Sequence, residues 1–317
     1  MRRHLSIVSQ RGAAIITALL IVVVVAGIAA SLIAQQSQSL TRTERANARA
    51  RAAWLAAPVL DYARDSIRQS FKPGKSVNLA QAWAQGIGAL PVEGGTATGR
   101  VIDHGGLFNL NNLVKDGKPS APDIDAFRRL LVNLKLDPGL ADAAADWIDS
   151  DDETSLPGGQ ENALYFAGAN AKRAANRQLV HPSELARTKG FDEGVMNRIA
   201  PLVTALPART AVNVNTAPEA VLAALIPELD ADTRTALVRA RQSQPFEAIT
   251  GERSLTSRFK SIPASAAERL GVTSDFLLVQ LGVEVEGAQV ARSALLKRRV
   301  NGGQEDWPAI IWVQNGL

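Results

Sequence analysis

The sequence has 317 residues, no cysteine and a formal net charge of +4 at pH 7, and 46% of its residues are hydrophobic. The lack of cysteine excludes disulfides, thiolate zinc sites and cysteine nucleophiles. The charge is unevenly divided, since residues 1–75 carry 11 basic and 3 acidic residues, a net +8, and the remainder carries 24 and 28, a net −4. The basic end suits an anionic membrane surface, and the mildly acidic remainder disfavours nucleic-acid binding.

An uncharged apolar run of 22 residues follows directly after Arg11 and Gly12 and extends from Ala13 to Ala34. At about 1.5 Å per residue, a helix of this length crosses a bilayer core of about 30 Å. The first 12 residues hold three arginines and no acid, which predicts a cytoplasmic N-terminus and an exported remainder. In a secretory signal peptide the small-residue cleavage site follows the apolar region. Here the small-residue junction precedes it, so cleavage after Gly12 would remove only a basic leader.

A second helical pattern follows and extends to about residue 71. Its apolar side chains recur every four residues and form one stripe, made of Leu55, Val59, Ala63, Ile67 and Phe71. Pro58 is expected to kink this helix or interrupt its hydrogen bonding, and Lys72-Pro73-Gly74-Lys75 is expected to end it. The pattern predicts one long helix, half in the membrane and half amphipathic.

The remaining sequence predicts strands on both sides of a helical block. Residues 99–110 are typical of a strand, a Gly-Gly turn and a short second strand. Helical spacing follows in 122–135, 139–148, 183–188, 192–205, 217–227, 231–242 and 264–270. Asp192 and Thr216 are expected to be N-caps, and Pro218 suits a first helical turn. Strand patterns return in 276–285, 288–300 and 308–313, so the simplest architecture is a helical domain inserted into an α/β domain.

The densest group of acidic residues lies between residues 146 and 162, where six acids and no base occur in 17 positions. So many carboxylates repel one another unless water or a cation neutralises them, and hard oxygen ligands suit Ca²⁺. An EF-hand is excluded, because counting from Asp149 places Thr154 at the turn glycine and Gln160 at the bidentate Glu. A different calcium loop stays open, with candidate ligands Asp149, Asp151, Asp152, Glu161 and Asn162. The alternative is a solvated acidic loop after a helix.

Catalytic chemistry has little support in this sequence. The three histidines, His4, His104 and His181, are isolated from one another, and no G-x-S-x-G, Walker A or H-E-x-x-H motif is present. Acidic residues without a recognisable partner do not make a general acid/base site. We therefore expect no enzyme and no small-molecule substrate.

A nucleic-acid alternative rests on residues 213–246, which resemble a helix-hairpin-helix unit. Such units join their helices through Gly-x-Gly, whose backbone N–H groups can contact phosphate. Here the joint reads Pro227-Glu228-Leu229-Asp230, and its two acids would repel phosphate. We interpret the segment as the same helix packing without nucleic-acid binding. A membrane-anchored nucleic-acid-binding protein remains the second hypothesis, and a plain signal-anchored periplasmic protein is the third.

Five motifs, in their order and spacing, resemble one known family over nearly the whole chain. They are Arg11 to Leu20, Gly106 to Asn111, Asp146 to Asp149 with Gly159 to Tyr165, Ala174 to Arg177 with Ser183 to Leu185, and Val212 to Pro218. The chain is similar here to the K-type minor pseudopilins of type II secretion systems, the general secretion pathway protein K family.

The resemblance implies an α+β pseudopilin fold. In this fold a long N-terminal helix, partly transmembrane, packs on a small antiparallel sheet, and a large all-α domain is inserted between strands. The expected divisions are a cleaved basic leader at 1–12, a transmembrane and assembly helix at 13–34, its amphipathic continuation at 35–75, a pseudopilin α/β domain at 76–114 plus 272–317, and the inserted helical domain at 115–271.

The resemblance also implies cleavage by prepilin peptidase after Gly12 and N-methylation of Ala13. Ordinary pseudopilins carry Glu at mature position five, where it neutralises the N-terminal ammonium of a neighbouring subunit in an apolar filament core. Here that position is Thr17, which supplies no counter-charge. A subunit with nothing above it needs none, so Thr17 fits a filament tip. Alternatively, Thr17 is one more small polar residue tolerated in a membrane helix.

The first hypothesis is therefore a non-enzymatic assembly protein of the bacterial inner membrane, with most of the chain in the periplasm. It would form the pseudopilus tip with the I- and J-type minor pseudopilins, join the major pseudopilin, and initiate assembly for export of folded proteins. Family members bind calcium in the inserted domain, which favours the calcium interpretation of the acidic loop. The family loop usually reads Gly-Ala-Glu-Asp where this chain has Gly159 to Asn162, with one acid fewer.

Overall fold

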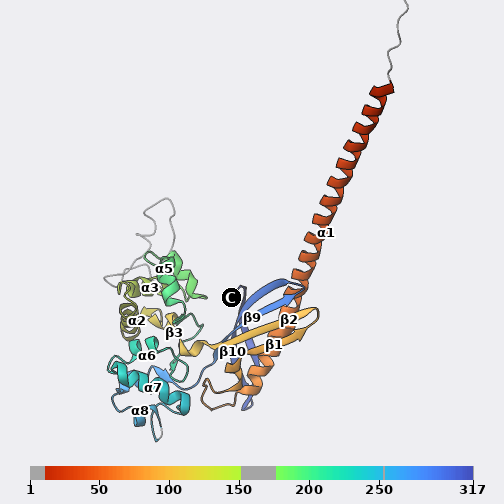
Figure 1. Cartoon of the computed structure of the whole chain (residues 1–317). Coiled ribbons are helices and arrows are strands. Elements are labelled where there is room, and N and C mark those ends of the chain that lie inside the picture. The colour runs from red at the N-terminus through yellow and green to blue at the C-terminus, as the bar shows by residue number, and fades with distance from the viewer. Residues whose placement is uncertain (1–10, 151–175, 253, 317) are drawn as a thin grey trace, which may run out of the picture.

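The computed structural model describes residues 11–150, 176–252 and 254–316. One long helix comes first, followed by two strands, a largely helical segment and three final strands. Figure 1 shows two lobes side by side, with the first helix packed on one lobe and extending far beyond it. We call them the sheet lobe (residues 48–103 and 274–316) and the helical lobe (the described part of 104–273).

A five-stranded antiparallel sheet forms the sheet lobe, in the order β1-β2-β9-β10-β11. The strands are β1 (Ile87–Val92), β2 (Gly95–Asp103), β9 (Phe276–Val285), β10 (Ala288–Asn301) and β11 (Gln304–Asn315). β2 pairs with β9 along its whole length, and Asp103 lies opposite Leu277 at the end where the helical lobe departs. Strands from both ends of the chain therefore meet in mid-sheet, as the sequence predicts.

Helix α1 (Arg11–Ser70) covers one face of this sheet with its C-terminal part. The predicted stripe is buried there, since Val59, Ala63 and Ile67 expose 3% of their surface or less. Alanines at 52 and 56 are buried on the same face, so the helix backbone lies close to the strands. Beyond the end of the helix, the ring of Phe71 stacks on that of Trp83 at 5.9 Å and closes this core.

Pro58 does not end the helix, because α1 is helical on both sides of it and through it, and the expected interruption is limited to one hydrogen bond. Proline removes one backbone donor and frees the carbonyl one turn earlier, at Trp54. Both residues lie on the exposed side of α1. Water can therefore satisfy that carbonyl, which explains why the helix tolerates the proline.

The helical lobe has its own core, in which the rings of Phe108 and Phe127 stack at 5.4 Å. Its helices are α2 (Ala121–Asn133), α3 (Leu140–Ile148), α5 (Glu193–Ile199), α6 (Glu219–Leu225), α7 (Ala231–Ser243), α8 (Leu255–Arg258) and α9 (Ala264–Ala267). Its 3-10 helices are η2 (His104–Gly106), η3 (Leu110–Leu113) and η4 (Pro182–Arg187), and η1 (Ala82–Gln85) lies in the sheet lobe. The α+β pseudopilin fold predicted from the sequence is confirmed.

Three pairs of two-residue strands accompany these helices in the described part of the lobe. They are β3 (Phe108–Asn109) with β6 (Val203–Thr204), β4 (Val114–Lys115) with β5 (Lys118–Pro119), and β7 (Val212–Asn213) with β8 (Leu270–Gly271). The helix predicted over 192–205 therefore stops at Ile199 and gives way to β6. Strands this short are set by distant partners and leave no periodic signal.

One of the two predicted N-caps is confirmed. The Asp192 carboxylate accepts a hydrogen bond from the backbone N–H of Val195 at 2.9 Å, as expected for the start of α5. Thr216 does not cap a helix, because α6 starts after Pro218 and the Thr216 hydroxyl donates to Asp103 instead. A buried acceptor on another element thus outcompetes the local cap.

The close approach of α1 to the sheet generates a stability prediction. Ala63→Leu places a larger side chain where no surface is exposed, so we expect a loss of about 1–3 kcal/mol in the free energy of unfolding. The matched control is Ala57→Leu, which adds the same atoms on the exposed side of α1. Urea unfolding of the detergent-solubilised protein, followed by tryptophan fluorescence, measures both. Equal midpoints for the two variants would contradict the close packing.

Candidate assembly site

The N-terminal half of α1 packs against nothing in the described chain. Every residue from 14 to 47 is exposed, including Ile15, Ile16 and Leu19, each at 60% or more. By length and composition this helix is the one candidate for crossing a membrane among the described residues, with a mean hydropathy of 2.9 in its most apolar window. A surface this apolar and this long needs lipid or protein around it.

Thr17 lies in this exposed part, and Gly12 and Ala13 lie in the first turn of α1. The Thr17 hydroxyl donates a hydrogen bond to the carbonyl oxygen of Ala14 at 2.9 Å. This bond satisfies the hydroxyl within the helix, as is common for Thr in apolar helices. The position therefore carries a satisfied polar group and no charge, so the apolar run is uncharged throughout.

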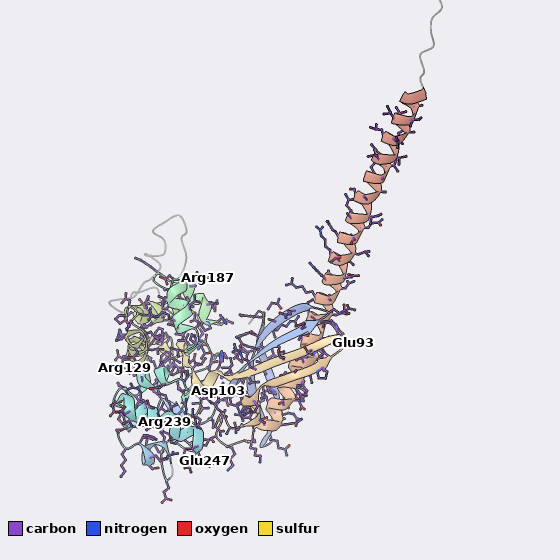
Figure 2. All side chains as sticks on the ribbon, viewed as in Figure 1. Glu93, Asp103, Arg129, Arg187, Arg239 and Glu247 are labelled. Carbon is purple, nitrogen blue, oxygen red and sulfur yellow. The ribbon has the colours of Figure 1, made fainter. Side chains whose placement is uncertain are left out.

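Asp103 connects the two lobes through its buried carboxylate (Figure 2). Asn213 and Thr216 of the helical lobe donate to Asp103 Oδ2 at 2.8 and 2.6 Å. The N–H of Gly105 donates to Oδ1 at 2.8 Å, and the Ser274 hydroxyl donates to the same oxygen. Burial raises the pKa of Asp103, and these four donors oppose that shift.

The sequence indicates a Gly-Gly turn here but not the reason for it. A side chain at Gly105 would place its Cβ 2.0 Å from Ser274 Oγ, and one at Gly106 would lie 2.4 Å from Thr216 Oγ1. Gly105 therefore leaves room for the Ser274 hydroxyl, and Gly106 leaves room for the Thr216 hydroxyl. Both hydroxyls donate hydrogen bonds to the Asp103 carboxylate. An acid at a strand end followed by two glycines is the available signal, and its partners lie more than 100 positions away.

Two histidines lie next to this junction. His104 Nδ1 is 2.8 Å from Thr204 Oγ1, and the His181 ring meets Trp312 of β11 edge-on at 5.6 Å. Burial is the main cause that lowers the pKa of His104 to about 4, with a smaller contribution from His181. His104 is neutral at pH 7 and contacts Thr204 within the helical lobe, whereas the contact of His181 with Trp312 joins the two lobes.

The predicted calcium ligands fall mostly outside the described residues. Asp151, Asp152, Glu161 and Asn162 lie there, so the structure does not place them. Asp149 directly follows α3 and is fully buried, as is Asp146 one turn earlier. Among the residues that are described, no three His, Asp or Glu side chains gather in a way that could hold a metal.

The helix pair considered for nucleic-acid binding uses its polar groups internally. The Asp230 carboxylate accepts the N–H of Thr233 at 2.7 Å and occupies the N-terminus of α7, where a phosphate would otherwise bind. Arg241 donates to the carbonyls of Val214 and Ala217. This arrangement holds the helices together and opposes an incoming phosphate.

An open cleft of about 750 Å³ lies between α2 and α6, near Arg129 at the outer side of the helical lobe (Figure 2). Its arginines already have partners in the chain: Arg128 pairs with Asp125 and Asp142, and Arg129 donates to the Ala224 carbonyl. Because these arginines already bond within the chain, we interpret the cleft as a groove between packed helices and not as a binding site.

A long N-terminal helix packed on a small antiparallel sheet is the fold of a pseudopilin. The helical lobe inserted between the strands narrows the chain to one type of pseudopilin. Family models described as "Type II secretion system (T2SS), protein K" match residues 106–208 and 212–273. The chain belongs to this protein K family and is a minor pseudopilin of a type II secretion system.

Individual relatives agree with this assignment. Type II secretion system protein K of Pseudomonas aeruginosa is 36% identical over 253 residues, 75% of this chain and 74% of that protein. The protein of the same name from Klebsiella pneumoniae is 31% identical and covers 96% of this chain and 98% of its own length. A chain in the crystal structure of the GspK-GspI-GspJ complex from enterotoxigenic Escherichia coli superposes with a TM-score of 0.67 at 25% identity, over 87% of this chain and 99% of that one.

The lowered pKa of His104 predicts a pH-dependent stability. The unfolded chain titrates near 6.5 and the folded one near 4, so between these values the unfolded state binds more protons and stability falls as the pH is lowered. We expect the His104→Gln variant to lose less stability over this window. Asp103 acts in the opposite sense, so the readout is the difference between the urea midpoints of the two proteins. If the urea midpoints of the two proteins changed with pH in parallel, the lowered pKa of His104 would be contradicted.

Proposed function

We propose that this minor pseudopilin forms the tip of a periplasmic pseudopilus, together with I- and J-type minor pseudopilins, and initiates its assembly above the major pseudopilin. The observation that carries the proposal is the exposed, uncharged face of α1 from residue 14 to 34, which includes Thr17 at the place of a counter-charge. A tip subunit has no neighbour above it whose ammonium would need neutralising. The relative of known structure was crystallised with an I and a J subunit, which supports the same partners here.

The proposed topology follows from the basic leader and the apolar helix. Prepilin peptidase cuts after Gly12 and leaves an N-methylated Ala13, and the helix over 13–34 stays in the inner membrane. The three arginines before the run favour a cytoplasmic N-terminus with both lobes in the periplasm. The protein acts by assembly and not by catalysis, and its bulky helical lobe beside α1 limits how far subunits can stack over it (Figure 1).

The test is to isolate the tagged protein from membranes that also contain the I- and J-type subunits. We expect a complex with both and a mature chain that begins at N-methylated Ala13, seen by intact mass. A chain that begins at Met1, or one cut beyond about residue 30, would contradict the processing. Isolation without either partner would contradict the tip assignment.

We also propose that the acidic segment binds calcium. Its support is the composition between residues 146 and 162 and the burial of Asp146 and Asp149 where the segment begins. Carboxylate and amide oxygens suit Ca²⁺. Asp149 with Asp151, Asp152, Glu161 and Asn162 would hold the ion and join the end of α3 to the following segment.

Calcium is therefore expected to stabilise the protein. At a free concentration 100 times the dissociation constant, the gain in free energy of unfolding is about 2.7 kcal/mol. Calorimetry of the purified protein with calcium and with chelator measures the gain. Asp149→Asn should reduce it, and Asp232→Asn, an exposed acid on α7, should leave it unchanged. No difference between calcium and chelator would contradict the proposal.

A further inference from the structure

The two outer strands of the sheet differ in how they are protected. β1 is six residues long, contains Gly88 and Pro91, and its pairing with β2 is irregular. Proline and irregular pairing are features that keep an edge strand from pairing with another chain. β11 is 12 residues long. Its first half contains Glu305, Asp306 and Pro308, and its pairing with β10 is irregular at two places, but from Ala309 to Asn315 it contains no proline, glycine or charge. The stretch after Pro308 is therefore the part of this edge that is left open to a further strand.

The open edge also exposes large apolar side chains. Trp307, Ile310, Ile311 and Val313 are each 39–44% exposed. Ile310 pairs with Leu296 and Val313 with Ala294, two residues of the core under α1, so both side chains point to the face that α1 covers. Ile311 is the extra residue of a bulge and adds to the same edge. Such a group of exposed apolar residues marks an interaction site.

This edge is continuous with the assembly helix. Arg64 of α1 donates two hydrogen bonds to the Pro308 carbonyl, at 3.0 and 2.9 Å. The guanidinium groups of Arg64 and Arg68 lie over the Trp307 ring, at 5.0 and 6.0 Å. The side of α1 and the edge of β11 therefore form one surface, which a subunit aligned with α1 would contact along its length.

Symmetry argues against a second copy of the same chain at this edge. Two copies that pair β11 with β11 antiparallel are related by a twofold axis normal to the sheet. That axis reverses every direction in the plane of the sheet, including the direction of α1, which packs along the sheet (Figure 1). The two apolar helices would then point in opposite directions and could not enter the same membrane. Pairing of β11 with β1 of another copy would keep the helices aligned, but β1 contains Pro91 and pairs irregularly, so we take the occupant to be a different chain.

We propose that the β11 edge, residues 309–313, is the docking surface for a neighbouring minor pseudopilin of the tip complex, which adds an extended apolar segment along β11. The inference rests on the proposed function, because it takes its occupant from the subunits of the tip. An edge strand supplies backbone hydrogen bonds along its length, and its exposed side chains supply selectivity. A partner anchored in the same membrane is well placed to lie along this edge, since its own membrane helix would run beside α1.

The chain has no cysteine, so one introduced thiol can be labelled alone. Val313→Cys in the full-length protein, labelled with benzophenone maleimide in membranes that contain the whole secretion system, should crosslink on illumination to an I- or J-type subunit. The matched control is Val132→Cys on α2, a valine of the helical lobe that is more exposed, at 56% against 44% for Val313. Adducts with a second copy of the same chain, adducts with lipid alone, or equal adducts from both positions would overturn the proposal.

A charge at the same place gives an independent readout. Val313→Lys should lower the affinity for the partner subunits by about tenfold or more, and Val132→Lys should not. The circular dichroism of each variant establishes that it is folded. If the unmodified protein binds neither subunit, the proposed function fails. If it binds both and Val313→Lys binds equally well, only the docking surface is wrong.

Discussion

One helix has to be stable in two surroundings, and the rest of the molecule depends on that constraint. From residue 14 to 47, α1 is exposed along its whole circumference, and from residue 48 onward one side of it is buried on the sheet. Helices gain most of their stability from tertiary packing, so the sheet lobe holds the second half in place. The first half has no packing partner in the described part of the chain and is left for a bilayer or for other subunits. Anchoring and assembly therefore fall to the same residues.

Much of the fold could be predicted, because strong periodic patterns reflect burial directly. The stripe through Val59, Ala63 and Ile67 and the strand over 276–285 both agree with the structure. What could not be predicted depends on partners far away in sequence. β6 replaces the end of an expected helix because Phe108 pairs with Val203, and Thr216 bonds to Asp103 instead of capping α6.

The candidate site was predictable to different degrees for physical reasons. The apolar run is visible in the sequence because membrane insertion depends on composition alone. The junction between the lobes leaves only the acid and the two glycines as a sequence signal, because a buried carboxylate is tolerated only when several donors converge on it. At Asp103 those donors come from Asn213, Thr216 and Ser274, which no local pattern connects. Most of the expected calcium ligands lie outside the described residues, so that part of the prediction stays a prediction.

The two ends of the helical lobe leave the sheet side by side, since Asp103 of β2 lies directly opposite Leu277 of β9. A tight turn of a few residues can bridge two antiparallel strands at such a position, so the sheet requires no particular length of chain between them. The helical lobe is in this sense an insertion in a smaller fold. A change in the length of the inserted lobe would therefore leave the register of β2 on β9 unchanged.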